Sequence, residues 1–290
     1  MPNRVDEFFK GTGEALKTCP KLYDDLVHPA AEETGKLLAT IPRAINAVLT
    51  PFNLWIEKCN FNYEKGQLLL AEKLKDENPE NIVQPEPYVA IPVIQAMSYS
   101  IDNDELRNLY ANLLAKSMQK DTKDSVHPSF VEVIKQLSPF EAKLLADLYN
   151  DFSINNDELP IIKLSASTHT EAETINIMVN FNDEINVLPD SLIVIANIIY
   201  PKYSNSLDLR FVSSALDNLT RLKLIDISYD ISIVNKSLYN NIINSPQMSQ
   251  YINKIEDGEL FRDHTHAIFS KGCLTPSSFG KFFVDICILE

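Results

Sequence analysis

Residues 85–149 read PEPYVAIPVIQAMSYSIDNDELRNLYANLLAKSMQKDTKDSVHPSFVEVIKQLSPFEAKLLADLY. This block combines helix-start signals with apolar residues at helical spacing, which predicts consecutive amphipathic helices. One helix is expected over Val89–Tyr99. Another begins with a complete start signal, in which Ser138 is the cap, Pro139 takes the first position and Glu141 the third.

A second start signal lies between these two helices. Asp102 and Glu105 resemble a capping box, because the Asp oxygen can accept a hydrogen bond from the third helical amide. The acidic run 102–104 does not predict a calcium loop, since Leu106 and Arg107 stand where further oxygen ligands and a turn glycine are needed. Helix caps and apolar stripes therefore account for nearly all of the block.

Three segments of the block carry a family resemblance: PEP at 85–87, DNDELRNLYANLLAKSM at 102–118 and VHPSFVEVIKQLSPFEAKLL at 126–145. Together they resemble the central region of the abortive-infection alpha family, a bacterial family linked to phage defence. The resemblance covers residues 36–150 best. It implies a defence role and assigns no mechanism to particular residues.

Size and charge bound what the whole chain can do. At 290 residues it is long enough that two domains are expected. The chain has 26 basic and 40 acidic residues, a net charge of −14, and residues 151–290 alone carry 10 basic against 18 acidic. A net-acidic chain repels phosphate backbones, so non-specific binding to nucleic acids is disfavoured.

The chain has four cysteines that lie far apart and form no C-x-x-C pair: Cys19, Cys59, Cys273 and Cys287. We interpret them as buried thiols of a reducing compartment. The first residues, MPNRVDEFFKGTGEALK, do not form a secretory signal. A cytoplasmic location is therefore expected.

Residues 37–59 read LLATIPRAINAVLTPFNLWIEKC and have apolar positions at helical spacing. Polar residues interrupt the run and Pro42 and Pro51 break it, so it lacks the roughly 20 largely apolar residues of a spanning helix. Its polar face is nearly neutral, whereas a surface-bound membrane helix favours Lys and Arg. We expect packing against the core or a partner, with membrane contact as the alternative.

The residue pattern changes after residue 150, where segments typical of strands begin to appear. The segments 159–165 and 175–181 are interpreted as strands or short helices. Asp190 is expected to cap a helix over SLIVIANIIY (191–200). The stretch 211–228, FVSSALDNLTRLKLIDIS, predicts a helix with a face that runs from Phe211 to Leu222, followed by a strand.

A second strand, a Leu274-Thr275-Pro276 helix start and a final helix are expected near the end of the chain. This order is similar to a winged helix. In that arrangement Arg210, Arg221 and Lys223 are the candidate phosphate contacts of a DNA-binding surface. Asp208, Asp217 and Asp226 lie among them, so we favour protein docking over DNA.

The histidines give no strong signal for a site. His127 precedes a proline and is interpreted as a local hydrogen-bonding residue. His264 and His266 alternate as they would on a strand, and Asp263 or Cys273 could join them at a metal. No second ligand pair has zinc spacing, so no metal site and no cofactor are predicted.

Phosphate-cradling and nucleophile motifs are also missing, and the chain has only seven glycines. The sequence therefore predicts a mainly α protein in three parts: an amphipathic segment (1–80), a central helical domain (81–150) and an α+β winged-helix-like domain (151–290). We expect a non-enzymatic phage-defence protein that binds a host or phage protein, with self-association also open. The alternatives are a DNA-binding regulator and a membrane-disturbing effector acting through residues 37–59.

Overall fold

The computed structural model describes residues 47, 49–50, 63–99, 103–170, 192–199, 201–203 and 208–289. The described residues divide into two compact units. Unit 1 lies within Met1–Gln136 and Ile286–Glu290, and unit 2 lies within Leu137–Asp285. The chain therefore passes from unit 1 to unit 2 and returns to unit 1 at its end.

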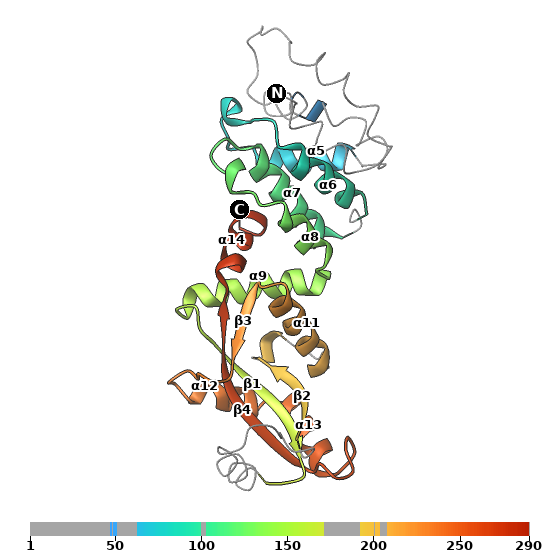
Figure 1. Ribbon diagram of the computed structural model, residues 1–290, viewed down its shortest axis with the longest axis vertical. Helices are drawn as coiled ribbons and strands as arrows, with labels where there is room; N and C mark the ends of the chain where they lie inside the picture. The colour runs from blue at the N-terminus through green and yellow to red at the C-terminus, as the bar shows by residue number, and fades with distance from the viewer. Residues whose placement is uncertain are drawn as a thin grey trace, which may run out of the picture. The chain divides into compact units, whose positions relative to one another are not determined.

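The described part of unit 1 is helical (Figure 1). Its elements are α5 (Tyr63–Lys73), η3 (Pro79–Asn81), α6 (Pro87–Tyr99), α7 (Asp104–Met118), η4 (Lys123–Ser125) and α8 (Ser129–Lys135). Helix α7 packs against α5, α6 and α8. Its buried stripe supplies the centre of this packing, and the apolar members of the stripe include Leu109, Tyr110, Leu113, Leu114 and Met118.

The helices of the central block were predicted well, but one cap was not. Helix α7 is capped by Asn103, whose Oδ1 accepts a hydrogen bond from Leu106 N at 2.9 Å. The prediction of Asp102 as the cap is therefore wrong by one residue, because the short Asn side chain makes the same contact from the next position. Helix α5 ends at Lys73.

Unit 2 contains a four-stranded antiparallel sheet in the order β2-β1-β4-β3. Its strands are β1 (Leu159–Ser167), β2 (Leu192–Ile198), β3 (Ile225–Ser228) and β4 (His266–Pro276). The last strand in sequence, β4, lies between β1 and β3 (Figure 1). The fold is therefore mixed α/β.

The other described elements of unit 2 are helices. They are α9 (Pro139–Ile154), α11 (Leu209–Arg221), α12 (Ser237–Ile243), α13 (Pro246–Glu256) and the first part of α14 (Ser278–Cys287), and the short η5 (Pro201–Tyr203) follows β2. Ile162, Leu164 and Ala166 alternate along β1 and enter one core cluster with residues of α12 and α13. Helix α11 packs against β2, β3 and α9.

Two sequence predictions for this unit are wrong. Residues 192–198 form a strand, β2, instead of a helix, because the Ile- and Val-rich segment pairs with β1. The Leu274-Thr275-Pro276 segment belongs to β4, and α14 starts at Ser278, where Ser277 Oγ accepts a hydrogen bond from Gly280 N at 2.8 Å. Segment 159–165 is a strand, and the helix and strand over 211–228 are confirmed.

Several sequence predictions fall outside the described residues. They concern Cys19, Cys59, Asp190, residues 175–181, and residues 37–59 apart from 47, 49 and 50. Cys273 and Cys287 are free thiols and are buried, as expected. By its contacts α9 belongs to unit 2, although the sequence-based division groups its residues with the central helices.

Candidate functional site

The solvent-facing side of α11 brings together more of the predicted site residues than any other described element. Its buried side carries the apolar residues Val212, Ala215, Leu216 and Leu219. The residues exposed on its other side, which we call the α11 face, are Arg210, Phe211, Ser214, Asp217 and Arg221. Two of the three predicted nucleic-acid contacts lie on this face, and Lys223 follows directly after the helix.

Arg210 is held at the start of α11 by the residue that caps the helix. Asp208 Oδ1 accepts a hydrogen bond from Arg210 N at 2.8 Å, and its Oδ2 lies 3.0 Å from Arg210 Nη2. Tyr251 of α13 also donates a hydrogen bond to Asp208. The Arg210 guanidinium and the Tyr251 hydroxyl together hold the pKa of Asp208 well below its usual range.

Arg221 is tied to its own helix. Its Nε and Nη2 donate to Asn218 Oδ1 at 3.1 and 2.7 Å. The Asn218 amide in turn donates to Glu141 Oε1 at 2.8 Å. Glu141 is only 8% exposed and also accepts from Ser138 N, which confirms the capping box predicted for α9. The guanidinium therefore ends a hydrogen-bonded chain that starts at a buried carboxylate.

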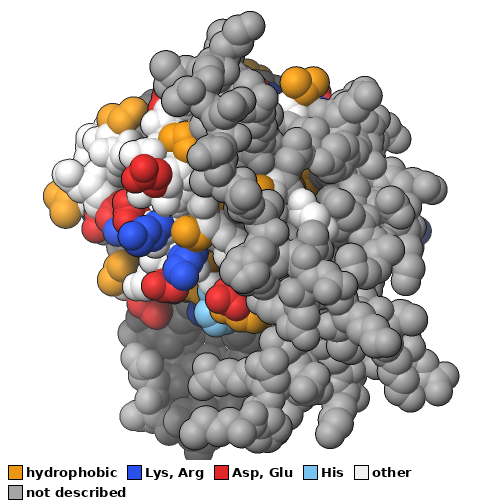
Figure 2. All heavy atoms as spheres, turned by 90° about the horizontal axis from the view of Figure 1, so that it is seen from above, with side chains coloured by type: hydrophobic (Ala, Val, Ile, Leu, Met, Phe, Trp, Pro, Cys, Tyr) orange, Lys and Arg blue, Asp and Glu red, His pale blue; other side chains and the backbone are white. Residues whose placement is uncertain are grey.

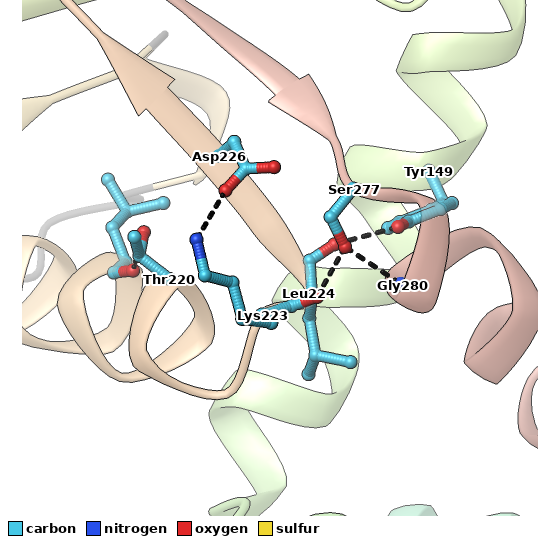
Figure 3. A network of polar contacts seen from close by, with 8 residues as sticks. Tyr149, Thr220, Lys223, Leu224, Asp226, Ser277 and Gly280 are labelled. Carbon is cyan, nitrogen blue, oxygen red and sulfur yellow. Dashed lines mark hydrogen bonds and ion pairs between the residues drawn. The ribbon is translucent and has the colours of Figure 1, made fainter.

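Lys223 lies in the turn between α11 and β3, with a positive φ of 59°. Its ammonium points toward Asp226, with Nζ 3.1 Å from Oδ1 (Figure 3). The backbone around it is fixed by neighbouring side chains, because Ser277 Oγ donates to Lys223 O and Tyr149 OH donates to Leu224 O at 2.8 Å. The position of Lys223 is thus set by the packing of the turn.

The middle of the α11 face is acidic and is bonded to the sheet. Asp217 Oδ1 accepts a hydrogen bond from Asn197 Nδ2 of β2 at 2.9 Å. Tyr229 OH donates to Asn197 Oδ1 at 2.7 Å, and the Lys163 ammonium lies 4.0 Å from the centre of the Tyr229 ring. Burial raises the pKa of Tyr229, so its hydroxyl stays protonated and acts as a donor.

An aromatic pair lies at the start of the same face. Phe211 is 51% exposed, which contradicts its expected place on the buried side of α11. Its ring centre is 5.0 Å from that of Phe140 of α9, at an interplanar angle of 47°. Neither Phe140 nor Asn218 was singled out from the sequence, because their roles depend on the packing of α9 against α11.

The three candidate cations do not form a phosphate-binding cluster. Arg210 and Arg221 are eleven residues apart on α11, so their backbones are separated by about 16 Å along the helix. Arg210 and Lys223 each face a carboxylate, and Arg221 faces an amide oxygen. Each of the three candidate cations therefore has at least one partner within the protein. The arrangement presents basic and acidic side chains on the same helix as an exposed aromatic ring.

Of the described histidines, His127 makes a local hydrogen bond and His264 packs against a nearby ring. His127 Nδ1 accepts from Ser129 N at 3.1 Å, at the start of α8. His266 begins β4 and His264 precedes the strand, with its ring 6.2 Å from that of Phe261. Within the described ranges, no three His, Cys, Asp or Glu residues lie close enough to hold a metal ion.

The fold and the α11 face define a two-unit protein with a candidate recognition surface. A family model described as abortive infection alpha matches residues 62–287. The chain therefore belongs to the abortive-infection alpha family, and this membership implies a role in phage defence. No curated protein and no solved structure matches the chain. Of the helices in the described part of the chain, none has the length and apolarity needed to cross a bilayer.

Proposed function

We propose that this protein acts in phage defence by binding a protein of the host or the phage through the α11 face, without catalysis of its own. One observation carries the proposal: Arg210, Arg221 and Lys223, which a nucleic acid would need, are already bonded to neighbouring groups of the protein. Exposed Phe211 follows Arg210 in the sequence and offers apolar contact area. Aromatic residues and Arg are enriched at protein interfaces.

We also propose that unit 2 is a modified winged helix. The segment order α9, β1, α11, β3, β4 and the strand order β1-β4-β3 support this reading. Strand β2 extends the sheet beyond β1, and α12 with α13 occupies the connection between β3 and β4. Because winged helices bind either proteins or DNA, the fold does not decide between the two.

The test is a phage plaque assay with the full chain expressed in a sensitive host. We expect wild-type protein to lower the efficiency of plating and Phe211→Ser to abolish this protection. Val234→Ser is the matched control, because Val234 is a 95% exposed apolar residue of unit 2 outside the α11 face. Equal protection by wild type and Phe211→Ser would show that protection does not depend on the α11 face.

A second candidate function is DNA-binding regulation, which the winged-helix-like strand order favours. A mobility-shift assay on duplex DNA at low and moderate salt separates the two functions. We expect no shift, because unit 2 is acidic and its candidate cations are paired. A salt-dependent shift that Arg221→Glu with Lys223→Glu abolishes would establish the regulator instead.

A further inference from the structure

Strand β2 forms one edge of the sheet in unit 2 (Figure 1). Among the described strands it pairs with β1 alone, so no described strand lies along its other side. In an antiparallel ladder, alternate residues direct their N–H and C=O groups away from the paired strand. On an edge strand these groups form a template for pairing with a further strand. Strand β2 therefore carries a row of backbone groups that another strand can use.

The open part of this edge lies at the beginning of β2. Asn197 N donates to Ser213 Oγ at 2.8 Å, so α11 covers the edge near the end of the strand. The register with β1 shifts at Ile195, which has no residue of β1 opposite it. Outside the ladder with β1, no hydrogen bond involves residues 192–194 within the described part of the chain. The open edge is therefore residues 192–194.

The side chains of this stretch are apolar and accessible. Val194 is 57% exposed, and Leu192 and Ile193 are half-buried. The whole strand reads LIVIANI and holds no charged residue, no Pro and no Gly. In the view of Figure 2, by contrast, apolar side chains of described residues lie among acidic and basic ones. Short segments of high β-propensity without charge or Pro are prone to pair with copies of themselves.

The opposite edge of the sheet is less suited to a second strand. Strand β3 has only four residues, Ile225–Ser228. One of them is Asp226, and pairing two copies of this edge would bring like charges together. Short length and charge are two ways in which natural proteins protect an edge strand. Of the two edges, β2 is the one open to pairing.

We infer that two copies of this chain pair through residues 192–194 of β2 as an antiparallel, two-fold dimer. The second copy supplies an uncharged strand with the same open edge, so both rows of backbone groups find partners. Each copy has one such edge and the two-fold pairing uses both, so the assembly closes at two copies. A stretch this short forms a small interface, so we expect a weak dimer with a micromolar dissociation constant.

The inference does not depend on the α11 face, but it bears on how that face is used. A dimer carries two α11 faces. A partner with two binding sites would be held more tightly by the dimer than by one chain, because the second contact forms within the complex.

Sedimentation equilibrium of the full chain, from low to high micromolar concentration, tests the pairing. We expect a monomer–dimer equilibrium that added salt strengthens, because each chain has a net charge of −14 and salt screens the repulsion between copies. Val194→Lys should remain monomeric over the same range, since lysine on an edge strand opposes pairing. This change makes the chain less negative, so repulsion between net charges cannot account for the loss.

Two variants serve as controls, and thermal melts confirm that each variant is folded. Val234→Lys makes the same change at a 95% exposed position outside β2 and should dimerise as wild type. Val194→Thr keeps an uncharged β-branched side chain on the edge and should also dimerise.

Hydrogen exchange of the wild-type chain gives a second readout that needs no variant. The amides of residues 192–194 should gain protection as the protein concentration rises. Four results would overturn the inference: a monomer at every concentration, equal association of wild type and Val194→Lys, growth beyond the dimer, or unchanged protection at 192–194.

Discussion

The side-chain amide of Asn112 donates a hydrogen bond to the backbone carbonyl of Cys287, a residue 175 positions later in the chain. Asn112 is 6% exposed and Cys287 is fully buried, so little water competes for the bond. Both residues belong to unit 1. The last residues of the chain are therefore part of the helical unit at its beginning.

Replacing Asn112 by Ala should destabilise the protein by about 1–3 kcal/mol, because it leaves the buried carbonyl of Cys287 without its donor. Urea unfolding followed by circular dichroism measures the change. Asn150→Ala is the control, since Asn150 is exposed on α9. Equal midpoints for the two variants would show that the carbonyl finds another partner.

Gly280→Ala should destabilise the protein, although it adds only one methyl group. A Cβ at this position would lie 1.9 Å from Leu224 O and 2.2 Å from Tyr149 OH. Overpacking of this kind costs about 1–3 kcal/mol, and the close atom here is backbone. Ser278→Ala, at an exposed position two residues earlier, should have little effect on the thermal midpoint.

Lys223→Gly should be more stable than Lys223→Ala by about 0.5–1 kcal/mol. Residue 223 has a φ of 59°, a conformation that glycine adopts without the Cβ penalty. Both variants lose the exposed ion pair with Asp226, so their difference reports the backbone alone. Equal unfolding free energies in urea would contradict this prediction.

Asp208→Asn should make stability less sensitive to acid. The lowered pKa of Asp208 means that its ionised form stabilises the folded state. That contribution is complete above the unfolded pKa of about 4 and is lost as the pH falls toward the folded value. It should stay below about 1 kcal/mol, because the Asp208 side chain is 45% exposed and solvent screens its interactions.

The measurement for Asp208 is urea unfolding from pH 6 to pH 2. Asn keeps an oxygen that can cap α11, so the variant isolates the charge. Asp121→Asn is the matched change at an exposed position of unit 1. A stability curve for Asp208→Asn that falls as steeply as wild type below pH 4 would show that other groups carry the acid dependence.

Local signals predicted the elements whose determinants are local. Ser138 and Glu141 make the predicted capping box, and the apolar spacing after residue 211 forms α11. Strand β2 could not be predicted in this way, since an Ile- and Val-rich run becomes a strand here through its pairing with β1. The same holds for the final turn of the chain, whose packing against α7 has no local signature.

The candidate site was predictable in part. The residue types and their spacing indicated three candidate cations: Arg210, Arg221 and Lys223. The sequence did not indicate which neighbouring side chains would bond to them. Asn218, for example, bonds to both Arg221 and Glu141, and Glu141 lies 77 positions before Asn218 in the sequence. The exposure of Phe211 depends on how α11 lies against α9. Such features arise from tertiary packing, which a helical periodicity does not encode.

The place of β4 has a consequence for how this protein is made. Residues 266–276 separate β1 from β3 in the finished sheet. During synthesis β1 can pair with β2 early, but it leaves the ribosome about a hundred residues before β4, its other partner, so the sheet cannot be completed on a partial chain. A prematurely terminated product would lack both the finished sheet behind α11 and the residues that close unit 1.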